Sequence, residues 1–133
     1  MATATATSED FDELIEGDGI VLVDFWAEWC GPCRQFAPVF EAASEQHQDI
    51  RFLKVDTEEE RELAARAAIT SIPTLMAFRD GILVYARPGA LPAPMLEQLI
   101  EGVRALDMDD VRRQLAEQEA ASEGMAGSAE ATG

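Results

Sequence analysis

The chain has 133 residues, of which 47% are hydrophobic, so it is long enough to bury a core without a metal ion or a disulfide scaffold. Its 26 acidic and 10 basic residues give a net charge of −16, which would repel a phosphate backbone and argues against nucleic-acid binding. Only two cysteines are present, too few for a secreted protein stabilised by several disulfides.

The N-terminal residues predict a short strand, a helix and a second, buried strand. Residues 3–7 alternate threonine with alanine, as in a short edge strand, and Ser8 before two acidic residues is typical of a helix start. Residues 20–26 are apolar at nearly every position, which favours a central strand covered on both faces. The first residues lack the basic and apolar regions of a secretory signal, and no apolar run reaches the ~20 residues of a membrane helix. We therefore expect a cytoplasmic protein that does not associate with membranes.

The middle of the chain alternates helix and strand patterns. Apolar residues at helical spacing predict a helix over residues 34–46, and residues 50–55 have the pattern of a strand. Thr57 and Glu60 have the spacing of a capping box, which predicts that a helix opens at Thr57.

A hairpin and a helix follow. Two strands, residues 74–78 and 82–86, are joined by a segment that contains Asp80 and Gly81, a strong hairpin signal. Prolines 92 and 94 open the next helix. The predicted order is β-α-β-α-β-α-β-β-α, which indicates an α/β fold whose sheet ends in an antiparallel hairpin.

The C-terminal residues differ in composition from the rest of the chain. Residues 107–133 carry seven acids and two arginines, and residues 1–20 carry six acids and no base, whereas residues 21–106 carry 13 acids and eight bases. We expect an additional amphipathic helix over residues 107–120 and a disordered acidic tail over residues 121–133. The working domain would then be residues 1–106.

The two cysteines lie two residues apart, in Cys30-Gly31-Pro32-Cys33, where the buried strand passes into a helix. A zinc half-site would need two more ligands, and the chain offers no other cysteine and a single histidine, His47. Two unreactive buried thiols are a second interpretation. We favour a third, a redox-active dithiol, because a Cys-x-x-Cys pair in a βαβ context is typical of that chemistry.

This position suits thiol–disulfide exchange. One helical turn brings two Cα atoms to the ~5–6 Å that a disulfide requires. Cys30 would lie at the helix N-terminus, where unpaired backbone N–H groups and the helix dipole lower a thiol pKa, so we predict Cys30 as the nucleophile. Cys33, one turn further in and less exposed, would resolve the mixed disulfide.

Three segments together resemble the thioredoxin family. Residues 23–33, Val-Asp-Phe-Trp-Ala-Glu-Trp-Cys-Gly-Pro-Cys, resemble the family's active-site strand and motif. Residues 71–75, Ser-Ile-Pro-Thr-Leu, are similar to its cis-proline segment, and residues 88–90, Pro-Gly-Ala, to its glycine turn. The resemblance covers about residues 3–106. It implies a thioredoxin fold with a central mixed sheet of four to five strands flanked by helices, to which a C-terminal amphipathic helix is added.

The resemblance also implies roles for individual residues. Asp24 would be a buried acid that exchanges a proton with Cys33 through water; the alternative is an aspartate that faces solvent at the strand edge. Pro73 would follow a cis peptide bond beside the dithiol. An apolar rim for docking targets would consist of Trp29, Gly31, Pro32, Ile72, Pro73, Gly89 and Ala90. Core packing is the alternative for Trp29.

One position departs from the family. Well-known bacterial thioredoxins carry a lysine on the neighbouring strand, close to the buried aspartate. Counting back from Asp56 places Phe52 at that position, so we expect Lys54, the only lysine, to miss the site. Without that charge Asp24 would be harder to ionise.

The function implied is reduction of protein disulfides by dithiol–disulfide exchange. The redox-active Cys30–Cys33 pair would need no bound cofactor or metal, with NADPH acting only indirectly through a thioredoxin reductase. Expected partners are disulfide-containing proteins and that reductase, and we expect a monomer. Two alternatives are a disulfide isomerase or oxidant on the same fold, and a chaperone-like binding protein that uses the apolar rim and the C-terminal helix.

Overall fold

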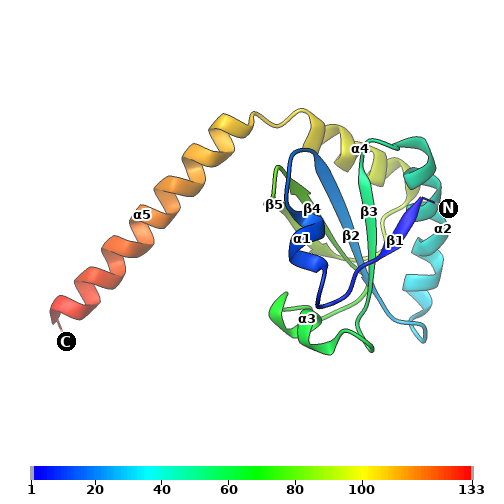
Figure 1. Ribbon diagram of the computed structural model, residues 1–133, viewed down its shortest axis with the longest axis horizontal. Coiled ribbons are helices and arrows are strands. Elements are labelled where there is room, and N and C mark those ends of the chain that lie inside the picture. The colour runs from blue at the N-terminus through cyan, green and yellow to red at the C-terminus, as the bar shows by residue number, and fades with distance from the viewer. Residues whose placement is uncertain (1, 133) are drawn as a thin grey trace.

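A five-stranded mixed sheet forms the centre of the computed structural model, which describes the backbone of residues 2–132 and the side chains of residues 2–123 (Figure 1). The strand order is β1-β3-β2-β4-β5. The first three strands in this order are parallel, whereas β4 runs antiparallel to both β2 and β5. The strands are β1 (Thr3–Thr5), β2 (Ile20–Trp26), β3 (Arg51–Asp56), β4 (Thr74–Arg79) and β5 (Ile82–Pro88). The predicted edge strand, central strand and terminal hairpin are confirmed.

Helices cover both faces of the sheet. They are α1 (Phe11–Ile15), α2 (Gly31–Gln46), α3 (Arg61–Arg66), α4 (Ala93–Arg104) and α5 (Met108–Thr132). Side chains of β2 alternate between two cores: Leu22 packs with residues of α2 and α4, whereas Val23 and Phe25 pack with residues of α1 and α3. This explains why β2 is apolar at nearly every position, since both of its faces are covered.

The predicted helix starts at Ser8 and at Thr57 are both wrong, for a shared reason. The helix predicted to start at Ser8 begins at Phe11. The Thr57 N–H and hydroxyl both donate to the Trp26 carbonyl, at 2.9 and 3.0 Å, so Thr57 joins β3 to β2 and does not cap α3, which begins at Arg61. The Glu60 carboxylate accepts instead from the N–H and hydroxyl of Ser8, at 2.8 and 3.1 Å. Tertiary hydrogen bonds have therefore taken the side chains that local spacing assigned to capping.

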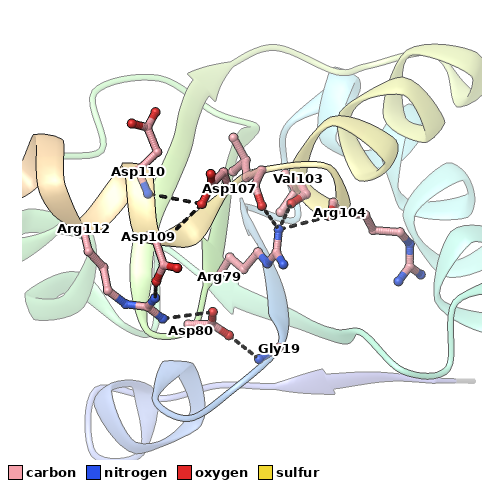
Figure 2. Close-up of polar contacts among 10 residues, drawn as sticks. Gly19, Arg79, Asp80, Val103, Arg104, Asp107, Asp109, Asp110 and Arg112 are labelled. Carbon is pink, nitrogen blue, oxygen red and sulfur yellow. Dashed lines mark hydrogen bonds and ion pairs between the residues drawn. The ribbon is translucent and has the colours of Figure 1, made fainter.

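The hairpin between β4 and β5 turns at Asp80 and Gly81, whose φ angles of 53° and 79° are both left-handed. This is the conformation of a two-residue type I′ turn, which the Asp-Gly pair predicts. Arg79, the residue before the turn, donates from Nη1 to the carbonyl groups of Val103, Arg104 and Leu106 at 2.8, 3.1 and 2.8 Å (Figure 2). Arg79 thus places a positive charge and hydrogen-bond donors at the C-terminus of α4, where the helix dipole favours them.

The C-terminal helix α5 leaves the body of the molecule after α4 and extends away from it (Figure 1). We expected a helix over residues 107–120 and a disordered tail over residues 121–133, but the helix continues to Thr132. Residues 121–133 contain four alanines, which have high helix propensity, but also three glycines, which have low propensity, so composition alone does not predict this helix. Over residues 2–132, no helix has the length and apolarity needed to cross a membrane.

Candidate active site

The two cysteines lie at the start of α2, where β2 ends. Cys30 is the N-cap of α2, Cys33 lies in its first turn, and the two form a disulfide with their Cα atoms 5.2 Å apart. The Cys33 N–H points at Cys30 Sγ, 3.2 Å away. A helix N-terminus directed at Cys30 stabilises negative charge on its sulfur, so the geometry suits a low-pKa thiolate once the pair is reduced.

Two loops close around the dithiol. The Ile72–Pro73 peptide bond is cis, as the family resemblance predicts, and the Ile72 carbonyl oxygen lies 3.7 Å from Cys30 Sγ. The N–H of Gly89 donates to the Pro73 carbonyl at 2.8 Å, with Gly89 at a φ of 115°, which favours glycine. The cis-proline segment therefore lies against Cys30, and the segment at Gly89 is hydrogen-bonded to the cis-proline segment.

Most residues of the predicted apolar rim are exposed at the surface. Trp29 is 66% exposed, which excludes the core-packing alternative, and Gly31, Pro32, Gly89 and Ala90 are exposed as well. Ile72 is half-buried, whereas Pro73 is buried beneath the surface. Cys30 itself is only 5% exposed. Little of the Cys30 side chain is therefore accessible, whereas most of the predicted rim residues are exposed.

Glu58 belongs to this surface, although no motif in the sequence singles it out. The Trp29 indole Nε1–H donates to Glu58 Oε1 at 2.7 Å. This contact joins residues 29 positions apart, so local patterns cannot reveal it. It holds the exposed indole in one orientation beside the dithiol.

Asp24 lies on β2, two residues before the strand ends, and is 1% exposed, so the solvent-facing alternative is wrong. Neither of its carboxylate oxygens has a hydrogen-bond partner among the described residues. Burial raises the pKa of Asp24 to about 7, with the charge of Lys54 acting in the opposite direction. A carboxyl that titrates near neutral pH can both accept and release a proton under physiological conditions.

The expectation that Lys54 misses the site is wrong. The parallel pairing of β2 with β3 sets Lys54 opposite Asp24 and Phe52 opposite Leu22, so Phe52 packs in the core with α2 and α4. Lys54 Nζ lies 5.0 Å from the centre of the Trp26 ring, a cation–π contact that directs the ammonium group toward this end of the sheet. The error was one of register, because counting along the chain does not fix which residues pair across strands.

No metal site accompanies the dithiol in the part of the chain that the structure describes. It contains no group of three or more histidine, cysteine, aspartate or glutamate residues that could hold a metal ion. His47, the only histidine, contacts Glu97 at 2.9 Å and Arg104 at 3.1 Å through its two ring nitrogens. The zinc interpretation therefore finds no second pair of ligands near Cys30.

Comparisons with known proteins agree with this geometry. The model of the family described as "Thioredoxin" matches residues 2–102. A Streptomyces coelicolor protein provisionally named thioredoxin 2 is 52% identical over 119 residues, 90% of this chain and 89% of that protein. Thioredoxin 1 of a Nostoc species is 44% identical over 102 residues, 75% of this chain and 95% of that protein. Among solved structures, Plasmodium falciparum thioredoxin has a TM-score of 0.69 at 39% identity and is covered over 98% of its length by 75% of this chain.

Proposed function

Because the chain belongs to the thioredoxin family and is a disulfide reductase that acts through its Cys30–Cys33 pair, we propose specific roles for the residues around that pair. Residues 1–106 form the catalytic unit in this proposal. The observation that carries it is the disulfide at the N-terminus of α2, held beside a cis-proline loop and preceded by a strand with a buried carboxyl group.

Cys30 is the attacking residue. In the reduced protein its thiolate attacks one sulfur of a target disulfide, a bond forms between the two sulfurs, and the second target sulfur leaves as a thiolate. The direction of the Cys33 N–H toward Cys30 Sγ supports this assignment, because it stabilises the thiolate form. Docking uses the apolar surface around Trp29, and the Ile72 backbone pairs with an extended segment of the target.

Cys33 is the resolving residue, and Asp24 handles its proton. The Cys33 thiol loses its proton to the Asp24 carboxylate through water, and the resulting thiolate attacks Cys30 Sγ. The mixed disulfide breaks, the target leaves fully reduced, and the Cys30–Cys33 disulfide forms, so two electrons pass from the pair to the target. The pKa of Asp24 near 7 supports this role, because half-ionisation at neutral pH suits a group that accepts and returns a proton.

A thioredoxin reductase recharges the pair with electrons from NADPH, and the working compartment is the cytoplasm, where thiols are kept reduced. The test is insulin reduction by the full chain with NADPH and a bacterial thioredoxin reductase. We expect turnover that is abolished in Cys30→Ser. Insulin reduction with dithiothreitol but not with the reductase would overturn the recycling step alone, whereas failure with both would overturn the proposed function.

The redox potential of the pair separates this function from that of an oxidant or isomerase. Reductants of this type lie near −270 mV, whereas isomerases and oxidants lie above about −200 mV. Equilibration with glutathione, followed by thiol counting, gives the value. A potential above about −200 mV would show that the chain donates disulfides instead of removing them.

A further inference from the structure

A second surface with the features of a binding site lies between β5 and α5. A groove of about 340 Å³ is lined by Ile82, Leu83, Val84, Leu106, Val111, Gln114, Leu115 and Gln118. We call it the α5 groove. One wall is the start of an edge strand, and the other is the first part of α5. No charged side chain lines it.

The α5 groove lies at the opposite end of the sheet from the dithiol. At the dithiol end, Phe25 of β2 pairs with Thr74, which pairs with Pro88. At the other end, Ile20 pairs with Arg79, which pairs with Ile82, one of the groove residues. A molecule bound in the groove would therefore leave Cys30 open to its targets.

Polar contacts hold α5 in place beside β5, so the groove is preformed (Figure 2). Arg112 of α5 forms ion pairs with Asp80 of the hairpin at 3.3 Å and with Asp109 at 3.4 Å. The other oxygen of Asp80 accepts from the Gly19 N–H at 2.9 Å. One carboxylate thus joins the hairpin, the loop before β2 and α5.

Apolar side chains in the groove are unusually exposed. Among the side chains that the structure describes, four large hydrophobic residues are strongly exposed: Trp29, Leu83, Met95 and Leu115. Trp29 belongs to the dithiol surface. Leu83 and Leu115, 48% and 39% exposed, both line the α5 groove, and Leu83 also borders a second hollow beside α1 and α3. Exposed apolar surface at a hollow is typical of an interaction site.

The charge around the groove selects the kind of partner. Glu117 lies three residues after Gln114, and Glu119 lies four residues after Leu115, so helical geometry places a carboxylate on each flank of the groove-lining stripe. Neither forms an ion pair with any described residue, whereas Arg112 and Arg113 are each paired with an aspartate. The rim is therefore acidic, and it favours lysine or arginine on the occupant.

The same charge argues against a second copy of this chain as the occupant. Each copy carries a net charge of −16, and residues 107–133 alone carry seven acids and two arginines. Two acidic rims brought together would repel each other, because like charges across an interface are unfavourable. A basic partner gains from the field that a second copy would oppose.

The edge strand favours an extended occupant over a helical one. β5 has β4 as its sheet neighbour, and no further strand pairs with its outer edge among the described residues. An extended segment can use such free backbone groups, whereas a helix has already satisfied its own. In an extended segment, side chains alternate between the groove and its rim.

We propose that the α5 groove docks an extended segment of a partner protein in which apolar side chains alternate with lysine or arginine. The apolar side chains enter between Leu83 and Leu115, and the basic ones meet Glu117 and Glu119. Such a partner holds the reductase by the end of the sheet that takes no part in disulfide exchange. The dithiol then stays free to act on the partner's neighbours.

The probe is a fluorescent seven-residue peptide of alternating leucine and lysine, which has the length of β5. Fluorescence anisotropy with the full chain should give saturable binding that weakens as salt is added, because the rim contacts are screened. A peptide of alternating leucine and glutamate should not bind. Equal binding of both peptides would overturn the charge argument.

Groove variants decide where the peptide binds. Leu83→Gln with Leu115→Gln should weaken binding about tenfold or more, since two leucine contacts are lost. Met95→Gln, an equally exposed methionine on α4, is the matched control and should change nothing. Glu117→Gln with Glu119→Gln should reduce both the affinity and its salt dependence, whereas Glu13→Gln on α1 should not. If the leucine pair and Met95→Gln weaken binding alike, the groove is not the site.

Two further measurements keep the proposal separate from the proposed function. Insulin reduction with dithiothreitol should be unchanged in the leucine variant and at saturating peptide. Loss of turnover at saturating peptide would place the peptide on the dithiol surface, and loss in the leucine variant would show that the groove and the dithiol are not independent; either result would overturn the proposal. Sedimentation should report a monomer. A dimer that the leucine variant dissociates would make a second copy the occupant and overturn the partner proposed here.

Discussion

The two ends of the central sheet differ in whether their polar groups have hydrogen-bond partners. At the dithiol end, both oxygens of Asp24 and the indole nitrogen of Trp26 are buried without a hydrogen-bond partner among the described residues. At the other end, both oxygens of Asp80 have partners, and one Arg79 nitrogen serves three carbonyl groups (Figure 2). Native proteins satisfy most buried polar groups, so the exceptions carry information.

This difference suggests that the polar groups at the dithiol end serve the chemistry, whereas those at the other end stabilise the fold. An unpaired buried carboxyl costs folding free energy, but it keeps a pKa that a fully hydrogen-bonded carboxylate would lose. The paired end supplies stability and fixes the position of α5, and nothing there must change protonation state. Substitutions at the dithiol end should therefore alter pH dependence, and substitutions at the other end should alter stability at every pH.

The largest effect is expected for Asp24→Asn. A rise of the pKa from 3.8 to about 7 corresponds to a cost of about 4 kcal/mol once the group is ionised. Because the folded pKa exceeds the unfolded one, the unfolded state loses its proton first as pH rises, and stability falls between about pH 4 and pH 7. Asparagine cannot ionise, so the variant should be more stable than wild type at pH 8 by up to about 4 kcal/mol and similar at pH 4.

Urea unfolding of the oxidised protein at both pH values measures this difference. A gain of the same size at pH 4 and pH 8 would point to altered packing and contradict the titration argument. Resolution of the mixed disulfide should slow in the variant, because its proton acceptor is gone.

Arg79→Met is expected to have the next largest effect. The methionine keeps an apolar stem but loses the charged group that donates to three carbonyls at the end of α4. Hydrogen bonds to charged groups and the helix dipole together suggest a loss of about 2–3 kcal/mol, independent of pH between 5 and about 9. Urea unfolding checks this, with Arg87→Met, an exposed arginine of β5, as the control. Insulin reduction by dithiothreitol should not change.

Most of the fold could be predicted because its signals are local. Continuous apolarity predicts β2, the Asp80-Gly81 pair predicts the hairpin, and the cysteine motif predicts the start of α2. The motif also led to the cis peptide bond before Pro73, a geometry that composition alone makes improbable. These features follow from residues close together in sequence, or from motifs whose context is specific.

Contacts between distant residues could not be predicted in this way. The position of Lys54 depended on the register of two parallel strands joined by a long crossover, and Glu58 became part of the dithiol surface only through the fold. Thr57 and Glu60 have the spacing of a capping box, but their side chains hydrogen-bond to residues distant in sequence. Local sequence patterns indicate which hydrogen bonds a side chain can form, and the tertiary structure determines which of them it forms.

Lys54→Met tests the electrostatics of Asp24 at the dithiol end, and its expected effect on stability is smaller. Removal of the positive charge takes away the interaction that opposes burial, so the pKa of Asp24 should rise above its present value. Stability at pH 8 should fall by on the order of 1 kcal/mol, and less at pH 4. Carbon-13 NMR titration of the Asp24 carboxyl measures the pKa. In an Asp24→Asn background, the stability loss caused by Lys54→Met should no longer depend on pH. An Asp24 pKa that is unchanged in Lys54→Met would contradict the pairing of Lys54 with Asp24.

The smallest effect is expected for Glu58→Ala, which releases the Trp29 indole from its 2.7 Å hydrogen bond. Both side chains are exposed, so stability should change little, and the effect should appear in docking. We expect kcat/KM for insulin reduction to fall by a factor of about three, mainly through KM, because an ordered indole loses less entropy on binding. Glu59→Ala, the next residue along the chain, is the matched control and should match wild type. If both variants lower kcat/KM equally, the effect is one of charge near the dithiol; if only Glu58→Ala does, the hydrogen bond to Trp29 is the cause.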